Sequence, residues 1–270
     1  MSKKSVRQMT SEVIENEEVS AGIFRLTLAA DSFPETAAPG QFIMVRTSDG
    51  VDPLLRRAFS IHDLMDRRIR ILYKVVGRGT GWLARRKKRD RIDLIGPLGT
   101  GFSVPKTVKT AWLVAGGIGV APFQMLIRIL RSKHIDTTLF FGAGTGNELV
   151  GLRDFEEQGI PQVLATEDGS AGEQGMIVEV FRKRIQLALG LPGKAKIDRS
   201  CRVYACGPQP MLLAVARLCR DSGVQGEVSM ESEMGCGIGT CMGCVIRTSR
   251  GYERVCREGP VFPAEEVLWE

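Results

Sequence analysis

The 270-residue sequence has only two histidines and few aromatic residues, which make up 6% of the chain. Neither His62 nor His134 stands in a recognisable nucleophile-and-base pattern, so hydrolytic catalysis is disfavoured. The scarcity of aromatic side chains also leaves few platforms on which nucleic-acid bases could stack. Internal repeats and low-complexity segments are absent as well, which argues against a repeat architecture.

Long apolar runs are also missing. No stretch approaches the ~18 uninterrupted apolar residues that a transmembrane helix needs. The N-terminus, MSKKSVRQMTSEVIE, has no apolar signal core behind its lysines. We therefore expect a cytoplasmic protein without membrane association. In that compartment an odd set of seven cysteines argues against a disulfide framework and toward metal or redox chemistry.

Charge is distributed unevenly along the chain. Residues 1–110 carry 20 Lys and Arg against 12 Asp and Glu, a net +8, whereas the remaining residues carry 17 against 19, a net −2. Much of the excess lies in RRKKRDR, residues 85–91. Because no aromatic residues are interleaved with this run, we interpret it as a solvated face, with a partner- or phosphate-facing role as the alternative. Nucleic-acid binding is not expected.

Residues 1–104 contain short runs of alternating apolar and polar residues, separated by Gly, Pro and Asp turns. The runs are GIFRLTLAA (22–30), QFIMVRT (41–47), RAFSIHD (57–63), RIRILYKVV (68–76) and DRIDLIGPLG (90–99). Alternation at this spacing is typical of an all-β barrel or sandwich. The sequence therefore predicts a β-barrel domain over residues 1–104.

From residue 105 to residue 228, apolar strands alternate with amphipathic helices. The strands are TAWLVAGG (110–117), TTLFFGAG (137–144), PQVLATEDG (161–169) and CRVYACGP (201–208); the helices are VAPFQMLIRILRS (120–132), GMIVEVFRKRIQLAL (175–189) and QPMLLAVARLCRDSG (209–223). A parallel sheet covered on both faces requires this alternation. We predict an α/β doubly wound nucleotide-binding domain here.

The remaining tail, residues 229–270, is rich in cysteine and too short to hold a core without a metal staple. Its thiols follow the spacing C-x4-C-x2-C-x11-C, in GCGIGTCMGC (235–244) and ERVCREGP: Cys236, Cys241, Cys244 and Cys256. The first three match plant-type [2Fe–2S] spacing rather than the paired C-x2-C knuckles of structural zinc, which stays the alternative. Four glycines let the loop aim backbone N–H groups at the sulfurs: Gly235, Gly237, Gly239 and Gly243. Cys201 and Cys219 are interpreted as small hydrophobes.

Two glycine turns follow predicted strands of the nucleotide-binding domain. In AGGIGVAPF (115–123), Gly116, Gly117 and Gly119 permit a pyrophosphate to approach the N–H groups at a helix start. In YACGPQPML, Cys206, Gly207 and Pro208 end a later strand on the same carboxyl edge, where ligands of open α/β domains bind. The alternatives are ordinary turn chemistry for the glycines and a buried filler role for the thiol.

A third motif, RRAFSI (56–61), lies in the barrel, with LYKVVGRGT (72–80) and GPLG (96–99) downstream. Arg57 can form a charge-assisted pair with a phosphate, and Ser60 can offer its hydroxyl to a ring nitrogen of a ligand. Taken alone, an arginine on an exposed strand points to solvent more often than to a ligand.

Together and in this order, the motifs resemble the ferredoxin–NADP reductase superfamily over residues from about 10 to 228. The tail, ESEMGCGIGTCMGCVIRT with YERVCREGPVF, is similar to that of the electron-transfer subunits of NAD-dependent (class 1B) dihydroorotate dehydrogenase. This second resemblance extends over essentially the whole chain.

The resemblance implies an FAD-binding barrel, an NAD-binding α/β domain and a [2Fe–2S] subdomain. It implies flavin contacts on a first strand by Arg57, Ala58, Phe59 and Ser60, on a second by Leu72, Tyr73 and Lys74, and in the pyrophosphate loop by Gly79 and Thr80. It also implies that the four tail cysteines bind the cluster. Two features depart from the family: Ala58 stands where proline is common, and the basic run 85–91 is unusually strong.

The activity implied is electron transfer, with no acid–base residue demanded. The resemblance implies that an FMN-containing catalytic partner oxidises dihydroorotate to orotate in pyrimidine biosynthesis, and that its electrons pass through the [2Fe–2S] cluster and FAD to NAD⁺. A flavin must stand between cluster and nicotinamide because they exchange one and two electrons, respectively. Ser60 is the residue we expect to hydrogen-bond near the reactive flavin nitrogen. The partnership implied is a heterotetramer with two copies of each subunit.

Three further expectations concern partners. The loop TGNEL after the strand TTLFFGAG has no Lys or Arg before Arg153, which favours NAD over NADP. Met234, Ile238 and Met242 supply apolar contact to the partner or only shield the cluster. The chain alone is not expected to oxidise dihydroorotate, since an FMN barrel of ~250 residues cannot fit beside the assigned domains.

Two alternative functions remain open from the sequence. One is a flavin and iron–sulfur reductase subunit of another complex, such as a sulfide dehydrogenase, a hydrogenase or a ferredoxin:NAD(P) system. The other is a non-enzymatic nucleotide-binding module with a zinc-stapled tail and a basic nucleic-acid patch. Visible absorption separates the second from the flavin readings, because zinc does not absorb visible light.

Overall fold

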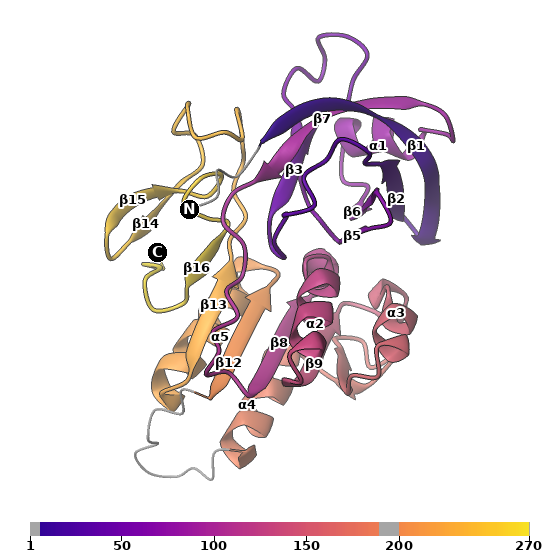
Figure 1. The fold of residues 1–270 in the computed structure, drawn as a ribbon. Coiled ribbons are helices and arrows are strands. Elements are labelled where there is room, and N and C mark those ends of the chain that lie inside the picture. The colour runs from indigo at the N-terminus through magenta and orange to yellow at the C-terminus, as the bar shows by residue number, and fades with distance from the viewer. Residues whose placement is uncertain (1–5, 189–199, 270) are drawn as a thin grey trace.

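The computed structural model describes residues 6–188 and 200–269. Leu189, the end of the predicted helix 175–189, and the first five residues of the predicted barrel domain lie outside these ranges. The described chain forms a seven-stranded antiparallel sheet, a seven-stranded mainly parallel sheet and a two-stranded hairpin (Figure 1). The predicted fold class, a β-barrel followed by an α/β domain and a small cysteine-rich subdomain, is confirmed.

The barrel sheet has the strand order β4-β3-β7-β1-β2-β6-β5. Its elements are β1 (Arg7–Ser20), β2 (Ile23–Ala29), β3 (Phe42–Val45), β4 (Arg57–Ser60), β5 (Asp63–Met65), β6 (Arg68–Lys74), α1 (Arg78–Ala84) and β7 (Arg91–Leu98). Inward-facing residues such as Leu26, Ile43 and Ile71 are fully buried. This burial explains why alternating apolar runs predicted the barrel strands.

Two barrel elements differ from the sequence expectation. Strand β1 was not expected, because only Ser11 and Val13 of its 14 residues are buried and its sequence lacks apolar alternation. Its strand conformation comes from antiparallel pairing with β2 and β7. Gly79 and Thr80, expected in a loop, lie in the first turn of α1. There the Thr80 hydroxyl accepts hydrogen bonds from the backbone N–H groups of Val76 and Gly77, at 2.9 and 3.1 Å.

The α/β sheet has the strand order β11-β10-β9-β8-β12-β13-β16. Its strands are β8 (Thr110–Gly116), β9 (Asp136–Ala143), β10 (Gln162–Thr166), β11 (Glu173–Gln174), β12 (Cys201–Cys206), β13 (Gln225–Ser229) and β16 (Val261–Pro263). Its helices are η1 (Gly117–Val120), α2 (Phe123–Ser132), η2 (Gly146–Glu148), α3 (Leu152–Glu157), α4 (Ile177–Ala188) and α5 (Gln209–Ser222). All pairs are parallel except β13 with β16.

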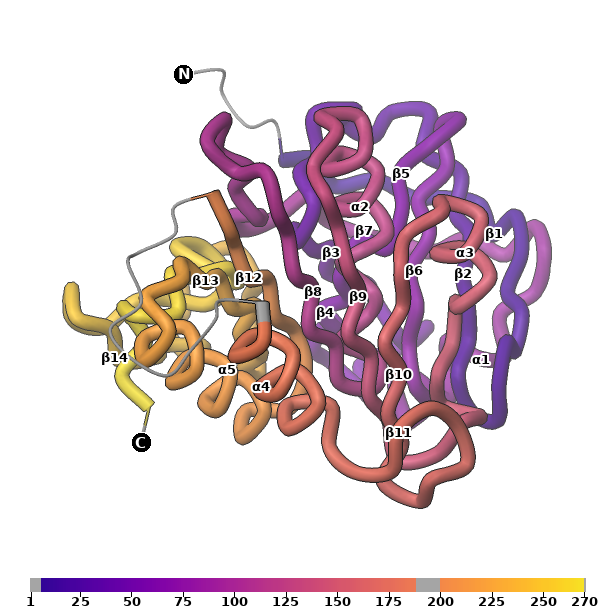
Figure 2. The backbone as a smooth tube through the Cα atoms, turned by 90° about the horizontal axis from the view of Figure 1, so that it is seen from below, coloured from indigo at the N-terminus to yellow at the C-terminus, as the bar shows by residue number. Residues whose placement is uncertain are grey.

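Helices cover both faces of this sheet. Phe181 of α4 and Val215 of α5 belong to one buried core, whereas Leu126 of α2 and Phe155 of α3 belong to another. Figure 2 shows α4 and α5 on one side of the sheet and α2 and α3 on the other. Strand β8 lies between β9 and β12, so the chain reverses its winding direction there. Open α/β sheets bind ligands at the carboxyl ends of strands at such a switch point.

The cysteine-rich tail joins both domains. Its hairpin, β14 (Val245–Thr248) with β15 (Gly251–Arg254), stands beside them, and β16 extends the α/β sheet by pairing with β13. The backbone N–H of Thr100, just after the GPLG segment, donates to the Gly259 carbonyl at 2.5 Å. Met44 of the barrel and Val255 of the tail share one buried core. The tail thus packs against the other domains rather than around a core of its own.

Candidate functional site

A cavity of about 840 Å³ lies where the barrel, the α/β sheet and the tail meet. Its wall consists of Phe42, Leu55, Arg56, Arg57, Ala58, Phe59, Ser60, Leu72, Tyr73, Lys74, Val76 and Thr80 of the barrel, Ile118 and Ala121 of the glycine turn, and Ser229, Met230, Glu231, Ser232, Glu233, Met234, Gly235, Gly243 and Pro260. Three motifs far apart in sequence therefore face one space. Its volume is in the range of about 300–1,000 Å³ that ligand and cofactor pockets occupy.

Strand β4 presents four of the predicted residues to this cavity. The Arg57 guanidinium donates through Nη1 to the carbonyl oxygens of Leu55 and Arg56, at 2.6 and 3.3 Å. Carbonyls hold the group in place without cancelling its charge. The neighbouring Arg56, by contrast, is paired with Asp93 at 2.8 Å. Arg57 therefore offers a positioned positive charge to an anion in the cavity.

Strand β6 adds Leu72, Tyr73 and Lys74 to the cavity wall. The Tyr73 hydroxyl donates to Asn16 Oδ1 at 3.1 Å, and its ring stacks on Phe24 with centroids 5.5 Å apart. Burial raises the pKa of Tyr73 to about 12, so it stays a neutral, fixed surface. Lys74 reaches the α/β domain, where its Nζ contacts Glu148 at 2.6 Å. This hydrogen bond is the main reason that the pKa of Glu148 is lowered.

The surroundings of Gly79 show whether the barrel residues of the cavity fit a flavin dinucleotide. A Cβ placed on Gly79 would stand 2.8 Å from Thr47 Oγ1 and 3.4 Å from the Arg57 side chain, so only glycine fits there. Thr47 Oγ1 is buried and has no hydrogen-bond partner in the described protein. A buried hydroxyl without a partner is costly unless a ligand supplies one. Gly79 thus packs closely against Thr47 and Arg57, and neither Thr47 nor Gly79 lies on the cavity wall. Arg57 does lie on the wall, and its positive charge suits a pyrophosphate.

The two glycine turns of the α/β domain are in backbone contact. A Cβ on Gly116 would stand 2.8 Å from the Pro208 ring, and one on Gly119 would overlap the Cys206 carbonyl. Gly117 has φ +53° and open space around it. The structure therefore brings the predicted residues Gly116, Gly117, Gly119, Cys206, Gly207 and Pro208 to one place at the carboxyl ends of β8 and β12. Ile118 and Ala121 of the first turn line the cavity, whereas the six predicted residues do not.

Cys206 is buried behind the cavity wall, and Glu231 is a wall residue to which no role was assigned from the sequence. The Cys206 thiol is 2% exposed and lies in the core instead of on the cavity wall, and burial raises its pKa well above the ordinary value. Glu231, which no motif singled out, lines the cavity, and the surrounding protein raises the pKa of its carboxyl. In the sequence nothing distinguishes Glu231 from Glu233, two residues away.

The four predicted cluster thiols lie together as two pairs. The side chains of Cys236 and Cys241 interact with each other, as do those of Cys244 and Cys256. Cys244 and Cys256 are each 2% exposed, whereas Cys241 is exposed. In the described ranges no three His, Cys, Asp or Glu side chains surround a single metal position. Two thiol pairs match a [2Fe–2S] centre, in which four cysteines are shared between two irons.

Backbone N–H groups point at the sulfurs, as the glycine content of the loop predicts. The Thr240 N–H donates to Cys236 Sγ at 3.3 Å, and the Cys256 N–H donates to Cys244 Sγ at 3.4 Å. Burial acts to raise the pKa of Cys236, but hydrogen bonds from Cys241, Ile238 and Thr240 outweigh it and lower the pKa to about 6. Such contacts favour the thiolate, which is the form that binds iron.

Arg254 holds the segment that contains Cys256 beside the loop that contains the other three cysteines. Its Nη1 donates to the Gly239 carbonyl at 2.7 Å, while its Nε and Nη2 bind the Glu258 carboxylate at 3.0 and 2.6 Å. The hydrogen bond from Arg254 lowers the pKa of Glu258 to about 2. Arg254 and Glu258 are only four positions apart in the chain, whereas Gly239 lies 15 positions before Arg254 and meets it only when the tail folds.

One side of the cluster loop, residues 234–244, packs against the protein core, and the other side faces solvent. Met234 packs against the core, and a Cβ on Gly237 would overlap Met44 of β3. Ile238 and Met242 are 52% and 51% exposed. Of the three residues expected to contact a partner, these two thus lie on the surface.

Outside the cavity, Cys201 and Cys219 are each 3% exposed and belong to the core, consistent with a role as small hydrophobes. In the basic run, Arg85, Lys87 and Lys88 are exposed. Among the described helices, none is long and apolar enough to span a membrane.

Two family models match the chain. The model described as the iron-sulfur cluster binding domain of dihydroorotate dehydrogenase B matches residues 231–268, and the oxidoreductase NAD-binding domain matches residues 113–217. Among solved structures, one of an NADH-dependent reduced ferredoxin-NADP oxidoreductase superposes with a TM-score of 0.83 at 27% identity, covering 96% of this chain and 90% of that chain. A ferredoxin NADP+ reductase from Neisseria gonorrhoeae with bound FAD and NADP shares the fold, with a TM-score of 0.67 at 18% identity over 83% of this chain and 99% of that chain.

Curated relatives cover nearly the full length. The chain is 38% identical over 259 residues to the dihydroorotate dehydrogenase B (NAD(+)), electron transfer subunit, of Bacillus velezensis, covering 93% of this chain and 95% of the relative. The identity to the corresponding subunit of Desulforamulus reducens is 34% over 258 residues, again covering 93% and 95%. The chain therefore belongs to the family of electron transfer subunits of dihydroorotate dehydrogenase B (NAD(+)).

Proposed function

We propose that this chain carries electrons from the FMN of a dihydroorotate dehydrogenase catalytic subunit, through a [2Fe–2S] cluster and FAD, to NAD⁺ in pyrimidine biosynthesis. The single observation that supports this most strongly is the cavity shared by the barrel strands, the glycine turn and the cluster loop. When bound, FAD exchanges hydride with nicotinamide and single electrons with an iron–sulfur cluster. A cavity lined by the barrel strands, the glycine turn and the cluster loop allows hydride transfer and single-electron transfer to occur at short range.

In this proposal the barrel holds FAD. Arg57 binds the pyrophosphate beside the helix start at Gly79 and Thr80. Gly79 lets this helix start pack closely against Arg57, and the Thr80 hydroxyl fixes it. Ser60, at the end of β4 on the cavity wall, donates its hydroxyl to a ring nitrogen. The second wall is formed by Leu72, Tyr73 and Lys74, with Ala58 and Phe59 completing the first.

The nicotinamide nucleotide binds the two adjoining glycine turns, with Gly116, Gly117, Gly119 and Gly207 allowing its backbone approach. Pro208 and the buried Cys206 shape the second turn. Because the turn residues Ile118 and Ala121 also face the flavin cavity, a nicotinamide bound there lies beside the flavin.

The cluster is held by Cys236, Cys241, Cys244 and Cys256, in line with their pairing and their N–H contacts. These thiols must stay reduced to bind iron, which supports a cytoplasmic setting. The family to which the chain belongs implies a catalytic partner subunit. We propose that this partner carries FMN, forms a heterotetramer of two copies of each chain, and docks where Ile238 and Met242 are exposed.

A second candidate is a reductase subunit that serves a ferredoxin:NAD(P) system. It is favoured by the likeness to the solved NADH-dependent reduced ferredoxin-NADP oxidoreductase, at 27% identity over 96% of this chain. The two candidates share cofactors and differ in the protein that delivers electrons.

The first test is the absorption spectrum of the anaerobically purified chain. We expect flavin and [2Fe–2S] bands together, with one FAD, two irons and two sulfides per chain, and bleaching of the flavin band by NADH. A colourless protein that contains zinc would contradict the proposal. Isolation of the native complex then identifies the partner: a dihydroorotate-reducible FMN protein supports the first candidate, and a ferredoxin-linked partner supports the second.

A further inference from the structure

The strand that faces the flavin cavity continues into a corner that holds the nicotinamide turn. Ser60 lines the cavity, and two residues later the His62 side chain is buried against the start of α2. His62 Nδ1 donates to the carbonyl oxygen of Ala121 at 2.7 Å, because a carbonyl can only accept. Ala121 directly follows η1 and itself faces the cavity. Burial lowers the pKa of His62, so this contact involves a neutral ring near neutral pH.

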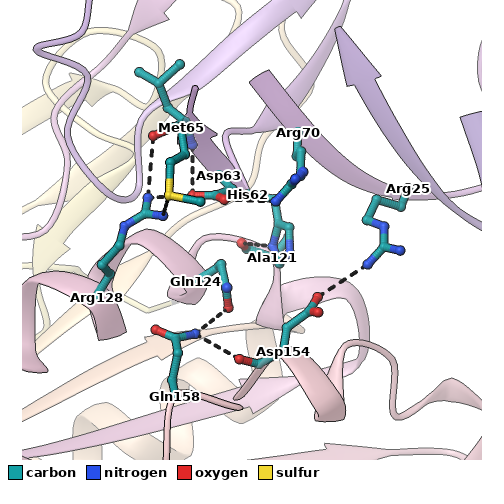
Figure 3. A network of polar contacts seen from close by, with 11 residues as sticks. Arg25, His62, Asp63, Met65, Arg70, Ala121, Gln124, Arg128, Asp154 and Gln158 are labelled. Carbon is teal, nitrogen blue, oxygen red and sulfur yellow. Dashed lines mark hydrogen bonds and ion pairs between the residues drawn. The ribbon is translucent and has the colours of Figure 1, made fainter. Parts of the chain in front are cut away.

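The next residue, Asp63, contacts helix α2 itself. Its carboxylate is 3% exposed and accepts from Arg128 of α2 at 2.5 Å and from Arg70 of β6 at 3.3 Å. Figure 3 shows the carboxylate between these two guanidinium groups. Arg128 also contacts Met65 Sδ at 3.3 Å. Arg128 crosses between domains, whereas Arg70 belongs to the barrel.

Around this corner, the interface between barrel and α/β domain is polar. Arg25 of β2 pairs with Asp154 of α3 at 3.4 Å. A second cavity, of about 590 Å³, runs between the corner and helices α2 and α3. Interfaces of this polar kind permit relative domain motion unless specific contacts restrain them. The contacts made by His62 and Asp63 are such restraints.

We propose that His62 and Asp63, which we call the clasp, are positioning residues for hydride exchange. They hold the turn before α2 at a set distance from strand β4, and so place the nicotinamide against the flavin. The inference rests on the proposed binding of FAD in the larger cavity and of the nicotinamide nucleotide at the glycine turns. Neither residue touches the reacting atoms: His62 acts through the Ala121 carbonyl in the turn before α2, and Asp63 acts through the Arg128 side chain of α2.

Arg128 and Arg70 form a matched pair for testing the clasp. Both bind Asp63, and their side chains are 38% and 37% exposed. Arg128→Met and Arg70→Met therefore each remove one arginine from the Asp63 carboxylate, and the carboxylate keeps its other arginine partner in either variant. Only Arg128→Met cuts a link between domains.

Both variants are purified anaerobically with FAD and cluster, and the rate of flavin reduction by NADH is measured by stopped flow. We expect Arg128→Met to lower the limiting rate by about 10- to 100-fold, because a misplacement of about 1 Å can cost that much. Arg70→Met should stay within about twofold of the unmodified chain, and Arg128→Lys should recover part of the rate. FAD and iron contents should match in all four proteins.

Hydrogen–deuterium exchange gives a readout independent of turnover. Arg128→Met should speed exchange in peptides that cover residues 117–123, and Arg70→Met should not. Equal rates and equal exchange in the two variants would overturn the clasp, as would an Arg128→Met rate like that of the unmodified chain. If the unmodified chain binds FAD but NADH fails to reduce it, the proposed function falls and the clasp inference falls with it. Loss of FAD from Arg128→Met alone would assign Arg128 to flavin retention and contradict positioning.

Discussion

Replacement of Arg57 by methionine tests the flavin assignment most sharply on the barrel side. Among the described residues, the Arg57 guanidinium donates hydrogen bonds only to the carbonyls of Leu55 and Arg56, so its charge is left for a ligand. Methionine keeps most of the apolar side-chain volume and removes the charge. The change therefore deletes one charge-assisted contact to a phosphate with little change in packing.

The expected magnitude follows from that contact. A hydrogen bond to a charged group contributes about 1.5–3 kcal/mol. Its loss in Arg57→Met should therefore raise the dissociation constant for FAD by about 10- to 150-fold. The constant is measured by titrating FAD into apoprotein and following flavin fluorescence. The thermal stability of the apoprotein should change little, because Arg57 makes no ion pair among the described residues.

Arg78→Met is the control for this experiment. Arg78 lies next to Gly79 but is 75% exposed and paired with Asp52, so its removal changes net charge equally without touching the cavity. We expect its FAD affinity to stay within about threefold of the unmodified chain, the range of weak surface electrostatics. Equal losses in the two variants, or an unchanged affinity in Arg57→Met, would refute the assignment of Arg57 to the pyrophosphate.

Three further changes probe the remaining parts of the site. Thr47→Val should leave FAD affinity unchanged and should not destabilise the apoprotein, because the buried hydroxyl has no protein partner and does not line the cavity; a drop in melting temperature would contradict this. Cys241→Ser should remove iron and sulfide while NADH still reduces FAD, and full iron content would defeat the ligand assignment. Glu258→Gln should cost up to about 1 kcal/mol of stability at neutral pH by breaking the solvent-screened ion pair with Arg254. Since the folded pKa of Glu258 is lowered from 4.5 to about 2, this difference should be complete above pH 4.5 and vanish as the pH falls toward 2; a difference independent of pH in thermal melts would argue against the ion pair.

The sequence predicted those parts of the site whose chemistry is written in local spacing. The interval pattern of Cys236, Cys241 and Cys244 indicates a cluster because one tight loop must deliver three sulfurs together. The glycine turn at 116–119 is likewise local, as it joins a strand to the helix that follows. The alternating apolar runs predicted the barrel because inward-facing side chains must be buried.

What escaped prediction depends on contacts between distant segments. Strand β1 has few apolar residues, and its pairing with β2 and β7 is set by backbone hydrogen bonds that composition does not reveal. The unpartnered hydroxyl of Thr47 becomes notable only beside Gly79, 32 positions later in the chain. Asp63 and Arg128, which lie 65 positions apart, meet only because the two domains pack together.

Reconstitution with the catalytic partner tests the central claim most directly. The purified chain, fully loaded with FAD and cluster, is mixed with the FMN-containing dihydroorotate dehydrogenase subunit from the same genome, and NADH formation from dihydroorotate and NAD⁺ is followed by absorbance. We predict no dihydroorotate oxidation by this chain alone, sustained NADH formation by the mixture, and loss of that rate with Cys241→Ser. No NADH formation by the mixture, with all cofactors present and NADH still able to reduce the FAD, would contradict the account and move the chain to a different electron-delivering partner.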